Sequence, residues 1–422
     1  MGRSQLYPPS VTPGIPKLGE KPTGWIETTF GDVLSTVKRP AQINDDDEYQ
    51  LVTAKRSRGG IVPRERLRGR GILTKTQFYI KSGDFVISKR QIIHGACGVA
   101  PATLDGAIVS GEYSVLRVKK GLMLEYLNYL THTVYFQQTC FQSSVGVDVE
   151  KMIFDLKEWL RFKVYLPPVD EQRKIVEILS SWDHAIALTG QLIAAKQQLK
   201  KGLMQLLLTG KVRFPEFRNR WIPIKISELI EDTISGDWGD TPDDSSNTMA
   251  ILRSTNFSGD GKIDPSKLAY RKILEHKIPR LLLKRGDILL EKSGGGPDQP
   301  VGRVAYFDLP GEFGYANFLA RLKIKTAFHS KAVFYFLLNY YASGRILRFQ
   351  QQTTGIRNFQ LTEFLKEKIE FPHEYNEQKR LADILSLCDQ EIGLIKQKLV
   401  LFQQQKKGLM QQLLTGKVRV KV

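Results

Sequence analysis

Cysteine is scarce in this 422-residue chain, which has Cys97, Cys140 and Cys388 far apart and no Cys-x-x-Cys pair. Such spacing argues against a structural zinc site and a disulfide framework, and it fits a reducing compartment. No apolar run approaches the roughly 18 residues that cross a bilayer, and the charged-then-apolar start of a secretion signal is missing. We therefore expect a cytoplasmic protein with no membrane partner. The histidines are equally scattered, at His94, His132, His184, His276, His329 and His373.

Motifs of DNA-modifying enzymes are also lacking. Base amino-methylation needs an Asp/Asn-Pro-Pro-Tyr/Phe element, and neither Pro8-Pro9 nor Pro167-Pro168 has those flanks. Gly294-Gly295-Gly296 is not followed by the Gly-Lys-Ser/Thr of a phosphate loop. A metal-dependent nuclease needs clustered carboxylates, and the start at Pro242-Asp243-Asp244 is not completed by Glu291-Lys292-Ser293. We expect no catalysis, no metal and no cofactor in this chain.

Positive charge, by contrast, is abundant. There are 62 Lys and Arg against 44 Asp and Glu, a formal net charge of +18 that is shared along the chain. A polyanion such as double-stranded DNA is the partner that this charge favours, and a basic surface without such a partner is the alternative. The 41% hydrophobic content indicates folded domains, and the length exceeds a single core.

The strongest pattern is an internal repeat. Residues 171–213 align without a gap onto residues 377–419, and 24 of the 43 positions are identical. Weaker matches precede the repeat, such as Gly83-Asp84 and Gly286-Asp287, each followed by an apolar run. The sequence therefore predicts a tandem duplication of one unit, a globular part followed by a long helix.

Each aligned segment predicts a helix of roughly 38 residues, about 55–60 Å long at 1.5 Å per residue. Apolar residues at alternating spacings of four and three run from Leu381 to Leu413, and less regularly from Ile175 to Leu207. This spacing is typical of a coiled-coil seam. We expect the two stripes to pack together as an antiparallel coiled coil; the alternative is that each helix packs only on its own domain.

The helix ends are predicted from their capping residues. Asp170 and Asn376 are expected to cap the starts, and Gly210 and Gly416 are expected to end the helices. The residues that end the second helix match those after which the first copy enters its Trp-bearing segment, so the second helix is expected to lead back toward the first globular part.

The sequence of each globular part predicts a mixed α/β domain. The chain as a whole is expected to belong to the α+β class. Short β-rich runs alternate with Gly/Pro/Asp turns, and one helical stretch follows in each part, over Leu124–Phe141 and Ser330–Gln350. The expected boundaries are 1–168 for the first globular domain, 169–213 for the first helix, 214–371 for the second globular domain and 372–422 for the second helix. The β-rich runs lie at 78–80, 85–88, 107–109, 114–118, 249–252, 288–290 and 318–324.

A basic segment of the first part is the leading candidate for DNA contact. With Gly59-Gly60 inside it and Glu65 as its one acid, it indicates a mobile loop that holds phosphates while single arginines reach guanine edges. The alternative is a solvated charged loop. The candidate residues are Lys55, Arg56, Arg58, Arg64, Arg66, Arg68 and Arg70.

Further candidates follow predicted strands. Lys89, Arg90 and Lys292 come directly after the Gly-Asp-led strand of each repeat, which makes them candidates to face a DNA groove. Arg253 and Asn256 follow another β-rich run, and their side chains suit guanine and adenine edges respectively.

The Glu-Gln start of each helix, the KKGLMQxLLTGKVR ending and the repeated layout resemble the specificity subunit of type I restriction–modification systems. The resemblance covers essentially the whole chain. It implies two target-recognition domains that each read one half of an asymmetric bipartite DNA site, with helices that act as spacer and docking surface for two modification methyltransferase subunits. S-adenosylmethionine is then expected in those subunits, and a translocating restriction subunit can join the assembly.

Two nearly identical surfaces at the helix ends also predict two copies of one partner. The rival classes are a free-standing DNA-binding regulator and a coiled-coil scaffold without a DNA role. Co-elution with a methyltransferase in a 2:1 ratio selects the first interpretation, whereas a scaffold shows no sequence-dependent DNA binding. The candidate partner-binding residues are Lys201, Leu203, Met204, Gln205, Lys407, Leu409, Met410 and Gln411.

Overall fold

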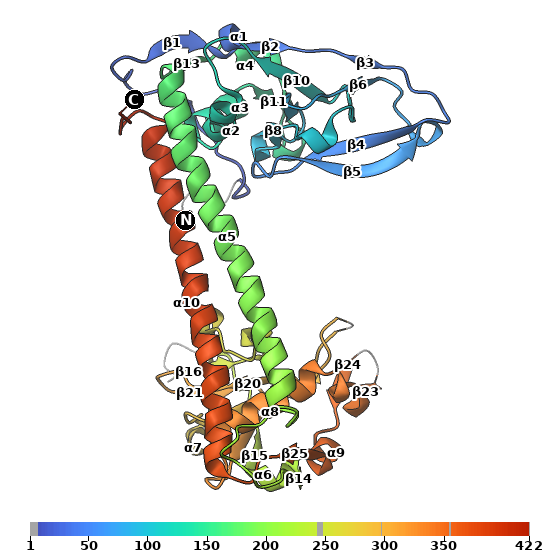
Figure 1. Cartoon of the computed structure of the whole chain (residues 1–422), viewed down its shortest axis with the longest axis vertical. Helices are drawn as coiled ribbons and strands as arrows, with labels where there is room; N and C mark the ends of the chain where they lie inside the picture. The colour runs from blue at the N-terminus through green and yellow to red at the C-terminus, as the bar shows by residue number, and fades with distance from the viewer. Residues whose placement is uncertain (1–6, 243–247, 297, 354–355, 422) are drawn as a thin grey trace. The chain divides into compact units, whose positions relative to one another are not determined.

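The computed structural model describes residues 7–242, 248–296, 298–353 and 356–421 (Figure 1). The chain forms two compact units, each assembled from segments of both repeats. Unit 1 combines Met1–Thr189 with Lys398–Val422, and unit 2 is Gly190–Gln397. Each unit thus contains one globular part, the first half of the helix that follows it and the second half of the other helix. In the described ranges, no helix is long and apolar enough to cross a membrane.

The described residues of unit 1 form four sheets. The strand orders are β1-β13, β2-β10-β7-β8, β3-β6-β9-β4-β5 and β11-β12, with β4 and β9 parallel. The strands are β1 (Ile26–Thr29), β2 (Leu34–Thr36), β3 (Pro40–Ala41), β4 (Glu48–Ala54), β5 (Ile61–Arg68), β6 (Gln77–Tyr79), β7 (Phe85–Ser88), β8 (Cys97–Val99), β9 (Ile108–Ser110), β10 (Tyr113–Val118), β11 (Ser144–Val145), β12 (Ile153–Phe154) and β13 (Lys163–Leu166). Its short helices are α1 (Phe30–Val33), α2 (Leu124–Leu130), α3 (Val134–Gln142) and α4 (Leu156–Leu160).

Unit 2 repeats this topology, which confirms the duplication. Its orders β14-β25, β15-β22-β18-β20 and β17-β16-β21 correspond to β1-β13, β2-β10-β7-β8 and β5-β4-β9, and a further small sheet is β19-β24-β23. The strands are β14 (Ile222–Lys225), β15 (Ile230–Ser235), β16 (Thr248–Leu252), β17 (Ala269–Lys272), β18 (Ile288–Glu291), β19 (Ser293–Gly294), β20 (Val304–Tyr306), β21 (Phe313–Tyr315), β22 (Leu319–Ile324), β23 (Gln350–Thr353), β24 (Ile356–Phe359) and β25 (Lys368–Phe371). Its short helices are α6 (Ile226–Leu229), α7 (Ile278–Leu281), α8 (Ser330–Ala342) and α9 (Leu361–Lys366).

The Gly-Asp pair has the same role in both units. Gly83 and Gly286 have φ values of 81° and 101°, a region that favours glycine. The following carboxylates, Asp84 and Asp287, accept the backbone N–H groups three residues earlier at 2.7 and 2.8 Å. The pair therefore closes the turn that leads into the central strand.

The two long helices are α5 (Val169–Leu207) and α10 (Tyr375–Leu413), each of 39 residues. The expected caps Asp170 and Asn376 are wrong by a few positions, because both residues lie inside the first helical turn. The glycine ends are confirmed: Gly210 and Gly416 follow the helices in the left-handed conformation, with φ of 68° and 67°.

The predicted antiparallel pairing is confirmed within each unit. In unit 1 the first half of α5 packs on the second half of α10, where the Trp182 and Phe402 rings meet edge to face at 5.6 Å. In unit 2 Lys196 of α5 pairs with Glu391 of α10 at 2.6 Å. Every position of the two predicted stripes is buried or half-buried.

The helix ends belong to the cores of the globular parts. The unit 1 core, built around the stacked Phe30 and Trp159 rings at 4.3 Å, includes Met410 and Leu413 of α10. The unit 2 core likewise takes Met204 and Leu207 from α5, together with Leu208 just after it. Full burial of such a side chain contributes about 1.5–3 kcal/mol.

The two short helical predictions are wrong in extent. The stretch 124–141 is broken, because Thr133 begins α3 by accepting the N–H of Phe136 at 3.2 Å. The stretch 330–350 is broken at Gly344, whose φ is 76°, and a 3-10 turn over Arg345–Phe349 follows. Capping and a left-handed glycine outweigh helical periodicity at these points.

Candidate DNA-recognition surface and helix junctions

The prediction of a mobile basic loop needs a correction, because much of this segment is a β-strand. Residues 61–68 form β5, which pairs with β4 at the edge of the five-stranded sheet. Arg66 and Arg68 are exposed on this strand, and Arg66 Nε donates to Gln50 Oε1 at 3.1 Å. Arg64 pairs with Glu65 at 2.6 Å and Arg70 with Asp46 at 3.2 Å. Exposed ion pairs of this kind are weak, so these cations can exchange their partners for phosphate oxygens.

The turn that precedes β5 holds its arginines differently. Arg56 pairs with Glu150 at 2.6 Å, whereas exposed Lys55 stays available at the surface. Ser57 and Arg58 have φ of 57° and 58°, a conformation that is rare outside glycine. This directs the Arg58 guanidinium inward over Gly95, and burial lowers the pKa of Arg58. The prediction that Arg58 contacts DNA is therefore wrong for this conformation.

Lys89, Arg90 and Lys292 lie at the predicted strand ends but are held by nearby acceptors. Lys89 Nζ donates to the Gly111 carbonyl at 2.7 Å, and Arg90 pairs with Glu112 at 2.6 Å. Lys292 Nζ donates to Ser235 Oγ at 2.7 Å, and burial lowers the pKa of Lys292. The structure thus brings the first two to one edge of unit 1 and places Lys292 at the corresponding strand end of unit 2.

The structure buries Asn256, so in this conformation it does not present its amide as the predicted base contact requires. Its side chain is 3% exposed, and its amide donates to the Asp264 carbonyl at 2.9 Å and the Lys267 carbonyl at 3.2 Å. Its Oδ1 accepts the backbone N–H of Arg253 at 2.9 Å. All of its polar groups are therefore used to hold the connection that leads toward β17. Arg253 is half-buried and donates to the Lys267 carbonyl at 2.9 Å.

The edge strand of unit 2 was missed as a candidate surface from sequence. Strand β17 occupies the edge position that β5 has in unit 1, and its Tyr270 is 58% exposed. The neighbouring Arg271 lies over the Trp238 ring at 4.7 Å. The only sequence signal was the short Tyr-Arg-Lys run, too brief to stand out before the edge position was known.

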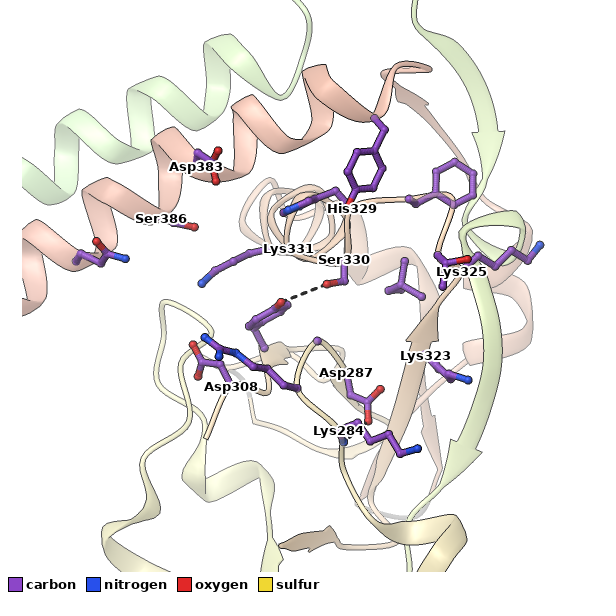
Figure 2. Close-up of a pocket in the computed structure, with 18 residues that line it drawn as sticks. Lys284, Asp287, Asp308, Lys323, Lys325, His329, Ser330, Lys331, Asp383 and Ser386 are labelled. Carbon is purple, nitrogen blue, oxygen red and sulfur yellow. Dashed lines mark hydrogen bonds between the residues drawn. The ribbon is translucent and has the colours of Figure 1, made fainter. Parts of the chain in front are cut away.

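A cavity of about 660 Å³ lies in unit 2 beside the N-terminus of α8 (Figure 2). Its lining carries charges of both signs, and Tyr306 and Ser330 share a hydrogen bond of 3.2 Å at its centre. The counterpart of Ser330 in unit 1 is Leu124, which approaches Gly83 as Ser330 approaches Gly286. The cavity suits water and ions more than an apolar ligand. Its charged residues are Lys284, Arg285, Asp287, Asp308, Lys323, Lys325, Lys331 and Asp383. His329 also lines it, and burial lowers the pKa of this histidine.

The repeated glutamate and arginine join the two helices reciprocally. Arg213, after α5, forms two hydrogen bonds to Glu377 of α10 at 3.0 and 2.9 Å. Arg419, after α10, forms two to Glu171 of α5 at 2.7 Å each. Hydrogen bonding to the glutamate raises the pKa of each arginine. Arg419 also lies over the Trp25 ring at 5.9 Å, which confirms that the end of the second helix returns to the first globular part.

The repeated glutamine has an equally local role. Gln172 accepts the backbone N–H of Met123 and donates to the Pro167 carbonyl, at 2.8 and 2.9 Å. Gln378 accepts the N–H of His329 at 2.8 Å and likewise donates to the Pro372 carbonyl at 2.9 Å. The Glu-Gln start of each helix therefore forms hydrogen bonds that hold the helix to neighbouring parts of the same chain.

Two polar triads were also missed from sequence, one buried in unit 2 and one partly exposed in unit 1. In unit 2 Lys200 pairs with Asp389 at 2.6 Å, and Tyr335 donates to the same carboxylate at 2.8 Å. In unit 1 Lys406 pairs with Asp183 at 2.5 Å, and Tyr129 donates to it at 2.7 Å. The signal was present, since both lysines interrupt the apolar stripes.

The partner-binding prediction needs a correction at its methionines. Met204 and Met410 are each 7% exposed and lie in the cores, so they are not surface residues. Leu203 and Leu409 are half-buried against the same cores. Lys201, Gln205 and Lys407 are exposed and Gln411 is half-buried. Intramolecular packing therefore accounts for part of the near-identity of the two motifs.

The architecture defines a class: a duplicated α+β protein in which each unit joins one globular part to halves of two long helices. The family model for the type I restriction modification DNA specificity domain matches twice, over residues 22–197 and 221–401. The chain therefore belongs to this family. It is a non-catalytic specificity subunit of a type I restriction–modification system and acts in DNA sequence recognition.

Similar proteins agree over nearly the full length. The type I restriction enzyme MjaVIII specificity subunit of Methanocaldococcus jannaschii is 26% identical over 429 residues, covering 95% of this chain and 94% of the relative. The HsdS subunit from Thermoanaerobacter tengcongensis has a TM-score of 0.52 at 18% identity, covering 94% and 98%. A chain solved in work on complex assembly and conformational transition of the type I R-M system has a TM-score of 0.61 at 18% identity, covering 94% and 100%.

Proposed function

We propose that the chain reads an asymmetric, bipartite site on double-stranded DNA, one half through each unit. The observation that supports this proposal is that the two units share one topology but carry different side chains on their edge strands. The edge strand of unit 1 presents Arg66 and Arg68, whereas that of unit 2 presents exposed Tyr270. Arg271 beside it is half-buried and donates to the Trp238 and Gly239 carbonyls at 3.2 and 3.4 Å. Equivalent scaffolds with different edge chemistry read different sequences, since base readout depends on the side chains presented.

DNA selection by the assembled complex tests this proposal. We expect selected sequences to contain two fixed half-sites separated by bases that vary freely. A continuous site without an unread interval would contradict the proposal, and so would binding without sequence preference. Arg66→Ala is expected to weaken contact at the first half-site alone, with Arg271→Ala as the matched change for the second.

The helix-end surfaces provide the proposed partner contacts. Lys201 and Gln205 in one repeat, and Lys407 and Gln411 in the other, remain on or near the surface of two nearly identical motifs. Two copies of one modification methyltransferase would dock there and bring S-adenosylmethionine with them, so this chain needs no cofactor of its own. A restriction and translocation subunit would join through that complex in the cytoplasm.

Charge reversal tests the docking surface. Lys201→Glu combined with Lys407→Glu is expected to lower methyltransferase affinity at least tenfold, because both exposed cations would become anions. Lys379→Glu, an exposed position outside the motif, is the control and is expected to leave affinity unchanged. Undiminished affinity and a 2:1 stoichiometry in the double variant would place the docking surface elsewhere.

A further inference from the structure

An extended arm at the start of the chain covers one side of α3 in unit 1. Thr12 Oγ1 donates to Gln137 Oε1 at 2.5 Å, and Gln138 Nε2 donates to the Pro13 carbonyl at 3.3 Å. The Tyr7 ring meets Phe141 edge to face at 5.6 Å. Val11 between them is only 7% exposed. A proline-containing segment without helix or strand is thus seated by one apolar side chain and a few hydrogen bonds.

The turn between β4 and β5 lies on the other side of the region that the arm covers. Ser10 Oγ lies 2.9 Å from His94 Nδ1, which joins the arm to the residues under the turn. The inward Arg58 lies close enough to His132 that burial and this charge together lower the pKa of His132 to about 4. The arm therefore contacts α3 at Gln137, Gln138 and Phe141, and it contacts His94 beside the inward Arg58.

The duplication identifies the corresponding surface of unit 2. The triad tyrosines Tyr129 and Tyr335, and the glutamines Gln172 and Gln378, are both 206 positions apart. The same offset matches His132 with Leu338, and it matches Tyr135 with Tyr341 and Gln137 with Ser343. Leu338, Tyr341 and Ser343 line an open groove of about 600 Å³ in unit 2, and Ser343 is the counterpart of Gln137, which the arm contacts in unit 1.

Nothing in unit 2 corresponds to the arm among the described residues. The connection between α5 and β14 spans 208–221, and it is used for the helix end, the Arg213 pair with Glu377 and Trp221. The turn Ser258–Asp260 borders the groove, and a side chain in place of Gly259 would begin in open space, since nothing lies within 4 Å of where its Cβ would be. The groove is therefore open to a segment from another chain.

The lining defines the chemistry of that segment. Met204, Leu338 and Ile392 give the groove apolar surface. Lys201 and Lys396 are exposed at it, whereas Lys200 is neutralised by Asp389 and Asp260 is the other carboxylate that lines the groove. A segment with an apolar anchor and an acidic side chain would complement this lining.

We propose that the groove takes an extended segment of the methyltransferase partner, apolar with at least one acidic residue, as the arm lies in unit 1. The inference rests on the proposed function and deepens it. Lys201 and Gln205 of the proposed docking surface line the groove, so the segment would continue the same contact. The two docking positions are then not equivalent: one is completed by this chain's arm, and the other captures a segment of its partner.

Filling the groove tests the proposal. Gly259→Trp adds a ring where there is open space, and Gly111→Trp is the matched control at an exposed, unobstructed glycine of unit 1. Native mass spectrometry with the methyltransferase is expected to show two copies on the wild-type and control chains and one copy on Gly259→Trp. Two copies bound to Gly259→Trp with unchanged affinity would overturn the inference. If the wild-type chain binds no methyltransferase, the proposed function itself fails.

A second variant avoids any question of folding. Lys396→Glu reverses an exposed charge at the groove without adding bulk, and it is expected to weaken one of the two copies about tenfold. A photo-crosslinker at Ser343 is expected to capture one segment of the methyltransferase. Crosslinks to a second copy of this chain instead, or unchanged binding of both copies to Lys396→Glu, would overturn the proposal.

Discussion

At the scale of single residues, Asp84 and Asp287 close equivalent turns, but their surroundings shift their pKa values in opposite directions. Burial alone would raise the pKa of Asp84, but hydrogen bonds from Arg39, the Lys81 backbone and Arg117 lower it overall. Burial raises the pKa of Asp287, and its nearest arginine, Arg321, is 4.0 Å away. Duplication therefore preserved the backbone role of this carboxylate while its ion pairs diverged.

This contrast gives a pH prediction. The lowered pKa of Asp84 contributes stability that is present above the unfolded value of about 4 and is lost as pH falls through the folded value. The raised pKa of Asp287 acts in the opposite sense, since protonation relieves the cost of a buried charge. Asp84→Asn is expected to lower the free energy of unfolding of unit 1 at pH 7 by roughly 1–3 kcal/mol and to reduce its further loss in acid.

Urea unfolding followed between pH 7 and pH 3 measures both effects. Asp287→Asn is the matched control, and it is expected to be neutral or stabilising at pH 7. Equal losses for the two variants at pH 7, or an unchanged acid dependence in Asp84→Asn, would contradict this account.

The arginines of unit 1 make a second prediction at this scale. Arg66 and Arg68 are exposed on the edge strand, so loss of one phosphate-contacting cation should lower the salt slope of DNA binding by about one unit. Arg58 faces inward, so Arg58→Met should leave that slope unchanged. Fluorescence anisotropy over a salt series measures both. A full unit lost from the slope in Arg58→Met would show that its guanidinium turns outward on DNA.

At the scale of elements, long periodic segments were predictable and short ones were not. The alternating stripes of α5 and α10 extend over many turns, so their signal exceeds local exceptions. Strand β5 was mistaken for a loop because its charges and Pro63 hide the pattern, and pairing with β4 is what makes it a strand. The inward direction of Arg58 depends on two positive φ angles, which composition does not reveal.

The polar triads supply the prediction for the long helices. Lys200→Met leaves Asp389 buried without its cation, which should cost about 3–5 kcal/mol of stability. Adding Asp389→Leu should restore much of that loss, because no buried charge then remains unpaired. Denaturant unfolding of the single and double variants forms the cycle that isolates the pair. Additive losses without recovery would show that the lysine and aspartate do not act together.

At the scale of the whole molecule, the duplication produces compact units that are each built from segments far apart in the sequence. Unit 1 contains residues 398–422 as well as the first part of the chain, and Arg419 on Glu171 and Trp25 is one of the contacts between them. The predicted division into domain, helix, domain and helix describes the sequence, whereas the compact units join halves of both helices to each globular part. This division explains why the repeated motif is nearly invariant while the globular parts differ.

Exchange of one globular part tests the central claim most directly. Residues 214–370 would be replaced by the matching segment of a relative, with Trp221 and the core positions that face α5 retained. Long-read methylation mapping of cells that carry this chain and its methyltransferase gives the modified sequence. Two independent reading units predict that one half of the methylated site changes and the other half is preserved. A change in both halves, or in neither, would contradict the account.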